Sequence, residues 1–299
     1  MQFADYQTQA LETDRTGLNG ADAAQLVPLL GLAGEAGQLL SEYKKWLRDG
    51  PSHVRFVDRM HEELGDILWY IANVASKYGL DLEDIAAANL AKTRARFGDH
   101  GGVALGSCER ESESFPDQFT LTFVQQVDGD RVIVRTLFNG EQVGAELTDN
   151  AHEDDGYRFH DVFHAGFVAM LGWSPVLRKL LGRKRKSVAK LDEVEDGGRA
   201  AVIEEGVAAL IFDYGRNHNF LQGAGGIDEA LLKTVRGMCA HLEVKKQPDA
   251  LWQSAIEQSF AAWRELNAAQ GGSLAVDRIA RTLRYVPVTP IANATAAAL

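Results

Sequence analysis

The chain has 299 residues, of which 45% are hydrophobic and 24% charged, and it is long enough for two domains that each bury a core. No apolar run approaches the ~20 residues that a transmembrane helix needs, so the composition excludes an integral membrane protein. The formal net charge of -11 opposes binding to nucleic acid or to an anionic membrane, and it favours sites where clustered carboxylates collect divalent cations.

Four helices are predicted in the first hundred residues. Apolar residues recur with helical spacing over residues 3–15, 24–48, 54–78 and 82–96. Ser52 is placed to cap the third helix, and Asp81 with Asp84 resembles a capping pair at the start of the fourth. Because short connections join long helices, we expect an all-α antiparallel four-helix bundle over residues 1–98.

The following segments predict a linker and a second domain. Residues 99–116 are rich in Gly, Ser and Glu, which is typical of a linker. Strands at 119–127 and 131–138, with a third short run after Asn139-Gly140, indicate a small antiparallel β-meander. Helical spacing then returns over residues 158–172, 175–181, 198–214, 227–242 and 248–267. The expected fold is therefore mainly α, with the bundle followed by an α+β domain over 117–285 and a frayed tail over 286–299.

Acidic side chains fall on single faces of the second and third predicted helices. Helical spacing puts Glu35, Gln38 and Glu42 on one stripe, and Glu63 and Asp66 lie one turn apart. Both faces are otherwise largely apolar, and acids are seldom buried without compensation. Packing the two stripes together would create a pocket of like charge, and such a pocket of hard oxygen ligands suits Mg²⁺, or Mn²⁺, with a triphosphate.

A structural explanation of the same pattern stays open. The acids could be solvated faces, and the small residues among them could serve only for close helix packing; these are Gly31, Gly34, Gly37 and Gly65. Glycine inside a helix costs ~1 kcal/mol relative to alanine. Four glycines in two helices therefore indicate a constraint from packing or from a ligand.

Two motifs resemble those of a known family. The runs Gly-Leu-Ala-Gly-Glu35-Ala-Gly-Gln38 and Glu62-Glu63-Leu-Gly-Asp66 are similar to the paired Glu-x-x-Glu and Glu-x-x-Asp motifs of MazG-like nucleoside triphosphate pyrophosphohydrolases, in the all-α NTP pyrophosphatase superfamily. The resemblance spans residues 3–98. It implies that catalytic acids bind Mg²⁺, namely Glu35, Glu63 and Asp66, with Gln38 and Glu42 as further metal ligands. It also implies that the nucleotide is held by Lys44, Lys45, Asn89, Lys92 and Arg96, although Lys44 and Lys45 could simply complement the dipole of a helix C-terminus.

One position departs from the family pattern. Gln38 stands where the family has a second glutamate, and its neutral amide is a weak metal ligand. Glu42 could substitute for it, the site could hold fewer metal ions, or activity could be lost. The resemblance thus implies hydrolysis of a standard or modified nucleoside triphosphate to nucleoside monophosphate and pyrophosphate by a homodimer or homotetramer. The alternative is a nucleotide-binding or regulatory protein in which the C-terminal domain carries the main role.

A second candidate site lies in the C-terminal half. His160 and His164 stand at i and i+4 on one predicted helix, a spacing that can grip a metal ion, and Asp161, Glu204 and Glu205 are further candidate ligands. Both histidines could equally be satisfied core residues. The His-Asp step is similar to that of the HD phosphohydrolases, but the other histidine and aspartate of that family have no clear counterparts. The region 117–285 resembles a C-terminal extension of some MazG-like proteins, which implies no particular activity.

Two remaining features bear on ligands and location. Seven cations crowd into residues 178–190, just before an acidic run, and they form either a solvated loop of offset charges or a site for a small anion. Cys108 and Cys239 are too far apart in the sequence to suggest a thiolate metal site, so we expect reduced thiols. Because the first residues lack the features of a secretory signal, we expect a cytoplasmic location.

Overall fold

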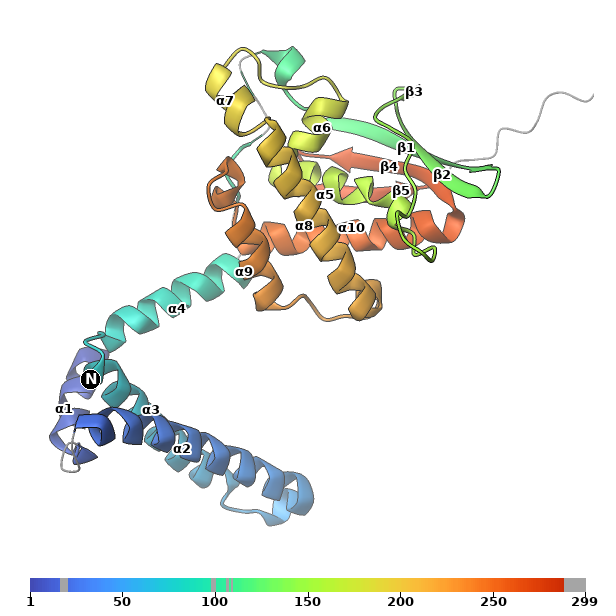
Figure 1. The fold of residues 1–299 in the computed structure, drawn as a ribbon. Helices are drawn as coiled ribbons and strands as arrows, with labels where there is room; N and C mark the ends of the chain where they lie inside the picture. The colour runs from blue at the N-terminus through green and yellow to red at the C-terminus, as the bar shows by residue number, and fades with distance from the viewer. Residues whose placement is uncertain (17–20, 98–100, 106–107, 109, 288–299) are drawn as a thin grey trace, which may run out of the picture. The chain divides into compact units, whose positions relative to one another are not determined.

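The chain divides into two compact units, Met1–Arg94 and Ala95–Leu299, each described by itself below. The structure is a computed structural model (Figure 1) that describes residues 1–16, 21–97, 101–105, 108 and 110–287, without the side chains of residues 21–23 and 97. Most of the predicted tail, residues 288–299, lies outside the described residues.

The four predicted helices are α1 (Phe3–Glu12), α2 (Ala21–Asp49), α3 (Phe56–Lys77) and α4 (Leu82–Phe97). The first unit contains all of them except the end of α4 that follows Arg94. Helices α2 and α3 form a long antiparallel hairpin joined through a short 3-10 helix, η2 (Gly50–Ser52). The expected cap of α3 is wrong, because Ser52 lies inside this 3-10 helix and α3 begins after Arg55. The Asp81 carboxylate does cap α4, since it accepts hydrogen bonds from the backbone nitrogens of Glu83 (2.8 Å) and Asp84 (3.3 Å).

Close contacts hold the first three helices together. A Cβ added at Gly31 of α2 would lie 2.2 Å from a ring carbon of Tyr70 on α3, so only glycine allows this approach. Helix α1 is tied to α3 by hydrogen bonds from Trp69 Nε1 to Thr13 Oγ1 (2.9 Å) and from Gln7 Nε2 to Ser76 Oγ (2.9 Å). Helix α4 packs on this group mainly through the buried Leu82, and most of its other described side chains are exposed.

The second unit is built on a five-stranded antiparallel sheet of order β3-β2-β1-β4-β5. The strands are β1 (Gln118–Asp128), β2 (Arg131–Phe138), β3 (Glu141–Gln142), β4 (Gly271–Asp277) and β5 (Thr282–Val286). The first three confirm the predicted meander, with Asn139 and Gly140 both at positive φ in the second turn. The hairpin β4-β5 was not predicted. It pairs with β1 across some 150 positions of sequence, with Phe123 opposite Gly272.

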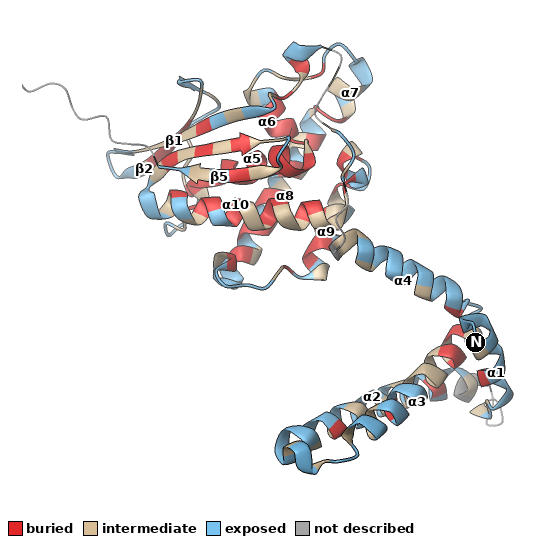
Figure 2. Cartoon of the chain, turned by 180° about the vertical axis from the view of Figure 1, so that it is seen from behind, coloured by how far each residue is buried: buried red, intermediate tan, exposed pale blue. Residues whose placement is uncertain are grey.

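Helices cover one face of this sheet. They are α5 (Asp161–Leu171), α6 (Pro175–Leu180), α7 (Ala189–Val194), α8 (Gly198–Asn217), α9 (Glu229–Met238) and α10 (Asp249–Ala269). Helices α5 and α10 lie against the sheet, and α8 lies on the far side of α5 (Figures 1 and 2). Every residue of α5 is buried, and only Asp161 and His164 among them carry ionisable side chains. Figure 2 shows the buried residues of this unit gathered between sheet and helices.

The segment expected to be a linker belongs to the second unit where it is described. Gln247 Nε2 donates a hydrogen bond to the carbonyl of Val103 (2.8 Å), and Arg278 Nη2 donates one to the carbonyl of Leu105 (3.0 Å). Phe115 is buried in the main core. Residues 101–105 and 110–116 therefore pack as part of the domain, and the linker expectation fails for them.

The basic run of residues 178–190 is largely neutralised by the acidic run that follows it. Arg178 and Arg185 are buried beside Asp196, and Lys184 pairs with Asp192 at 2.7 Å. This arrangement favours the interpretation as a loop of offset charges. The three cations already pair with acidic side chains, so they are not available to bind a small anion.

Candidate active site

The structure brings together three of the predicted metal ligands. Glu35 projects from α2, and Glu63 and Asp66 project from adjacent turns of α3. Each residue offers a carboxylate oxygen, and these oxygens all lie within 4.8 Å of one another. The hairpin of α2 and α3 therefore gathers three carboxylates at one point on its surface.

Among the described residues, no cationic side chain offsets the charges of this acidic cluster. Glu63 is 8% exposed, and burial, followed by the nearby Glu35 and Asp66, raises the pKa of its carboxyl above its ordinary value. Within the described ranges, no Lys, Arg or His side chain pairs with any of the three carboxylates. Hard oxygen donors of like charge without a cationic partner fit a divalent cation such as Mg²⁺.

Gln38 lies at the edge of the acidic cluster. Its side chain is exposed, and its amide Nε2 donates a hydrogen bond to Oε2 of Glu35 at 2.8 Å. A glutamate at this position would place a fourth carboxylate beside Glu35. The neutral amide instead binds one of the three acids that are present.

Glu42, the expected substitute ligand, is engaged elsewhere. It is buried, it accepts a hydrogen bond from Lys45, and its Oε2 lies 2.9 Å from Nε2 of His53. These two partners lower the pKa of Glu42, with the Lys45 hydrogen bond as the largest cause. Lys45 is thus committed to an ion pair, whereas Lys44 is exposed. The contact between His53 and Glu42 was not predicted, because His53 lies in the connection after α2, where the sequence has no helical spacing.

The predicted nucleotide-binding residues of α4 differ in their surroundings. Asn89 and Lys92 lie on the exposed surface of α4. Arg96 belongs to the second unit, where it donates a hydrogen bond to the carbonyl of Ile227 (2.8 Å). Burial, followed by the charge of Asp66, raises the pKa of the Tyr6 hydroxyl on α1. Tyr6 was not among the predicted residues, because its surroundings depend on the packing of α1 against α3.

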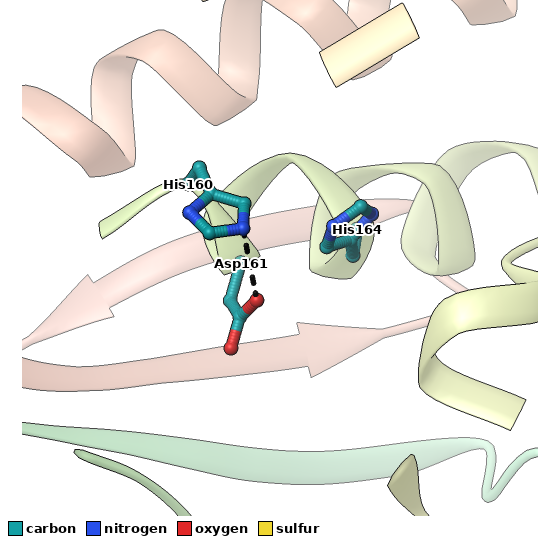
Figure 3. A group of neighbouring side chains, drawn as sticks. All are labelled: His160, Asp161 and His164. Carbon is teal, nitrogen blue, oxygen red and sulfur yellow. Dashed lines mark ion pairs between the residues drawn. The ribbon is translucent and has the colours of Figure 1, made fainter. Parts of the chain in front are cut away.

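A second group of polar side chains is buried in the other unit. His160, Asp161 and His164, at the start of α5, each offer a ligand atom, and these atoms lie within 4.8 Å of one another (Figure 3). Nε2 of His160 lies 3.8 Å from Oδ1 of Asp161. The structure also separates the two predicted glutamates of α8. Glu204 is fully buried behind His164, whereas Glu205 lies beside both histidines and is partly exposed.

Comparison with known proteins decides the family. The family model of the MazG C-terminal domain matches residues 106–289, more than half of the chain, and that of the MazG nucleotide pyrophosphohydrolase domain matches residues 28–99. The chain belongs to the MazG family. The Gene 37 protein of Mycobacterium phage L5 is 36% identical to it over 80 residues, which cover 26% of this chain and 68% of the phage protein. No solved structure matches the chain.

The two MazG matches divide the candidate residues. Glu35, Glu63 and Asp66 fall in the pyrophosphohydrolase match, whereas the buried histidine group falls in the match to the MazG C-terminal domain. Helix α1 with Tyr6 precedes the first match. None of the helices described in this MazG chain is long and apolar enough to cross a bilayer.

Proposed function

We propose that the MazG domain of this chain hydrolyses a nucleoside triphosphate to nucleoside monophosphate and pyrophosphate with the help of Mg²⁺. The observation that carries the proposal is the acidic cluster of Glu35, Glu63 and Asp66, which gathers three carboxylates without a cationic partner in the described part of the chain. The match to the MazG nucleotide pyrophosphohydrolase domain covers all three residues and supports the type of reaction.

Each acid has a role that follows from its surroundings. Bound Mg²⁺ would offset the charge of the triphosphate and of the leaving pyrophosphate. All three carboxylates would hold the cation, with Glu35 and Asp66 as the more exposed members. Glu63, the buried member, would also accept the proton of the attacking water. The water oxygen then bonds to the α-phosphorus as the bond to the β-phosphate oxygen breaks.

We also propose that the chain acts as a homodimer or homotetramer formed through the first unit. Leu40 is 70% exposed and Leu47 65% exposed, and both lie with Tyr43 on one stripe of α2. Nothing lies within 4 Å of a Cβ built at Gly34 or Gly37, so close packing inside one chain does not explain these glycines. A second copy would cover this apolar face.

One observation favours a second candidate function. Gln38 leaves the acidic cluster with three carboxylates where the family pattern has four, and this could weaken turnover. The chain would then bind a nucleotide as a regulatory protein without hydrolysing it. The cytoplasm remains the proposed location for either function, and both cysteines are free, as expected there.

Product analysis with the full chain separates the two functions. The substrates are the four nucleoside triphosphates, their deoxy forms, triphosphates with oxidised bases and guanosine tetraphosphate, each with Mg²⁺, with Mn²⁺ or with a chelator. We expect pyrophosphate and monophosphate from at least one triphosphate with Mg²⁺, and no turnover with the chelator. A nucleotide that raises the melting temperature without turnover would support the regulatory protein. Release of inorganic phosphate and a diphosphate would contradict the proposed cleavage position.

A further inference from the structure

His164 is a buried polar side chain whose Nε2 makes only a long ion-pair contact, 3.5 Å from Oε2 of Glu205. The residue is fully buried in α5, a helix with no exposed residue. Its Nδ1 lies 2.8 Å from Oε1 of Glu204, whereas its Nε2 has no hydrogen-bond partner among the described residues. A buried polar atom without a partner is costly and calls for an explanation such as a bound ion.

Second contacts fix the orientation of the side chains around this nitrogen. Glu204 also accepts hydrogen bonds from Oγ of Ser174 (2.5 Å) and from the backbone nitrogen of Val176 (2.8 Å), so its carboxylate holds the His164 ring in place. Nδ1 of His160 lies 3.0 Å from the carbonyl of Tyr157, and Oδ2 of Asp161 accepts a hydrogen bond from Thr136 (2.8 Å). These contacts engage Nδ1 of both histidines and Oδ2 of Asp161. Nε2 of both histidines and Oδ1 of Asp161 make only ion-pair contacts of 3.5 to 3.8 Å, and these atoms remain for a ligand. Metal-binding histidines are typically oriented by such carboxylate or carbonyl partners.

The spacing of the donor atoms approaches that of a metal site. Oε2 of Glu205 lies 3.5 Å from Nε2 of His164 and 3.8 Å from Nε2 of His160. Donors of a tetrahedral zinc ion with bonds of ~2.1 Å stand roughly 3.4 Å apart, so small side-chain movements would bring these atoms to bonding distance. A cavity of about 210 Å³ lined by His160, Asp161 and Glu205 gives an ion a way in.

We propose that His160, Asp161, His164 and Glu205 form a second metal centre, which binds one divalent transition-metal ion of the zinc class in the MazG C-terminal domain. Two imidazole nitrogens with carboxylate oxygens select Zn²⁺, Co²⁺ or Mn²⁺ over Mg²⁺, which prefers oxygen ligands alone. Glu204 is a positioning residue that acts through His164. This centre is chemically distinct from the all-oxygen acidic cluster of the MazG domain, so the two can be filled separately.

Cobalt binding to the full chain tests this centre. Co²⁺ is titrated in a large excess of Mg²⁺, which occupies the acidic cluster, and the visible ligand-field absorption of nitrogen-bound Co²⁺ is recorded. We expect one Co²⁺ per chain and loss of the absorption when Zn²⁺ is added. His160→Gln should weaken binding at least tenfold, and so should Glu205→Gln, whose native side chain is 47% exposed and whose change does not disturb the core.

His152→Gln is the matched control, because His152 is exposed and outside the group. It should bind Co²⁺ like the wild type, and circular dichroism should show that all variants are folded. The proposal is overturned if the wild type shows no such absorption, or if His160→Gln titrates like the wild type. Unchanged affinity in Glu205→Gln would overturn the four-donor arrangement. Pyrophosphate release at the acidic cluster plays no part in the readout, so the two proposals can fail independently.

Discussion

At the scale of single residues, the surroundings of an ionisable group decide what it does. Glu63 and Glu62 are neighbours in sequence, but Glu63 is buried beside two acids whereas Glu62 is exposed and paired with Arg59 at 2.6 Å. His164 and His152 differ in the same way, one buried against Glu204 and one exposed. Residue type and spacing identify candidate site residues. The burial of each side chain and its hydrogen-bond or ion-pair partners then distinguish site residues from surface residues.

The raised pKa of Glu63 predicts a link between pH, Mg²⁺ and stability. The folded chain holds a proton on Glu63 more tightly than the unfolded chain, whose glutamates titrate near 4.5. Without metal, this group should therefore lower the free energy of unfolding as pH rises from that value through the raised pKa. Mg²⁺ should reverse the loss, so the increase in melting temperature on adding Mg²⁺ should be larger at about pH 7 than at about pH 5.

Differential scanning fluorimetry with and without Mg²⁺ measures this effect. Glu63→Gln is the control, since the amide neither titrates nor repels its neighbours. The difference between wild type and variant removes the contributions of other carboxylates. An equal Mg²⁺ response at both pH values in the wild type would argue against Glu63 as part of the metal site.

Gln38→Glu should increase Mg²⁺ affinity. The change replaces the amide that donates to Glu35 with a fourth carboxylate at the same place. We expect the Mg²⁺ concentration for half-maximal pyrophosphate release to fall by about tenfold, which corresponds to ~1.4 kcal/mol of binding free energy, with activity kept or raised. A variant that needs more Mg²⁺ than the wild type would show that Gln38 serves the site as it is.

Part of the candidate site could be predicted at this scale. Helical spacing put Glu63 beside Asp66, and the family resemblance added Glu35 from the other helix; the structure brings carboxylate oxygens of all three within 4.8 Å of one another. The ion pair of Glu42 with Lys45 is an i,i+3 contact within α2, which spacing alone could have indicated. The contact of Glu42 with His53 joins α2 to the connection that follows it, and no local pattern encodes it.

At the scale of elements, periodic segments were predictable and the strands of the late hairpin were not. The four helices of the first unit were placed to within a few residues because each repeats its apolar pattern over several turns. The strands β4 and β5 are short, and β4 opens with Gly271-Gly272, which is typical of a loop. The pairing of β4 with β1 joins residues that are far apart in the sequence, so no local sequence pattern could predict it.

The contact between Gly31 and Tyr70 predicts that the effect of Gly31→Ala on stability depends on the Tyr70 ring. Gly31→Ala should destabilise the wild type by ~1 to 3 kcal/mol, because its Cβ would displace the Tyr70 ring from α2. In a Tyr70→Ala background the same change meets no ring and should stabilise the helix by up to ~1 kcal/mol. Urea unfolding of the four variants measures this coupling. Equal effects of Gly31→Ala in both backgrounds would mean that the ring does not determine the need for glycine.

At the scale of the whole molecule, the two units differ in how completely they bury apolar residues. The second unit has a continuous core between sheet and helices, whereas many large apolar side chains of α2 and α3 stay exposed. The family resemblance implied an oligomer, and this distribution supports an interface on the first unit. The exposed apolar stripe of α2 that is proposed as the interface could be located only from the structure, because helical spacing does not tell a core face from an interface.

The double change Leu40→Glu with Leu47→Glu should break the proposed oligomer. Two charges on the exposed stripe of α2 would be buried without partners in an interface, but they stay solvated in a single chain. Size-exclusion chromatography with light scattering measures the molar mass. The wild type should have the mass of two or four chains, and the variant should have the mass of one chain. Val202→Glu, at an exposed apolar position of α8, should leave the mass unchanged. A wild type that already elutes as a single chain would refute the oligomer.

The most direct test of the proposed hydrolase compares two neighbouring glutamates in the full chain. Pyrophosphate release with Mg²⁺ is measured for Glu63→Gln and for Glu62→Gln, using whichever triphosphate the wild type hydrolyses. Loss of a base that also contributes to the metal site should lower the rate by at least about a hundredfold in Glu63→Gln, whereas Glu62→Gln should stay within a few-fold of the wild type. Full activity in Glu63→Gln, or equal loss in both variants, would contradict the assignment of the acidic cluster as the active site.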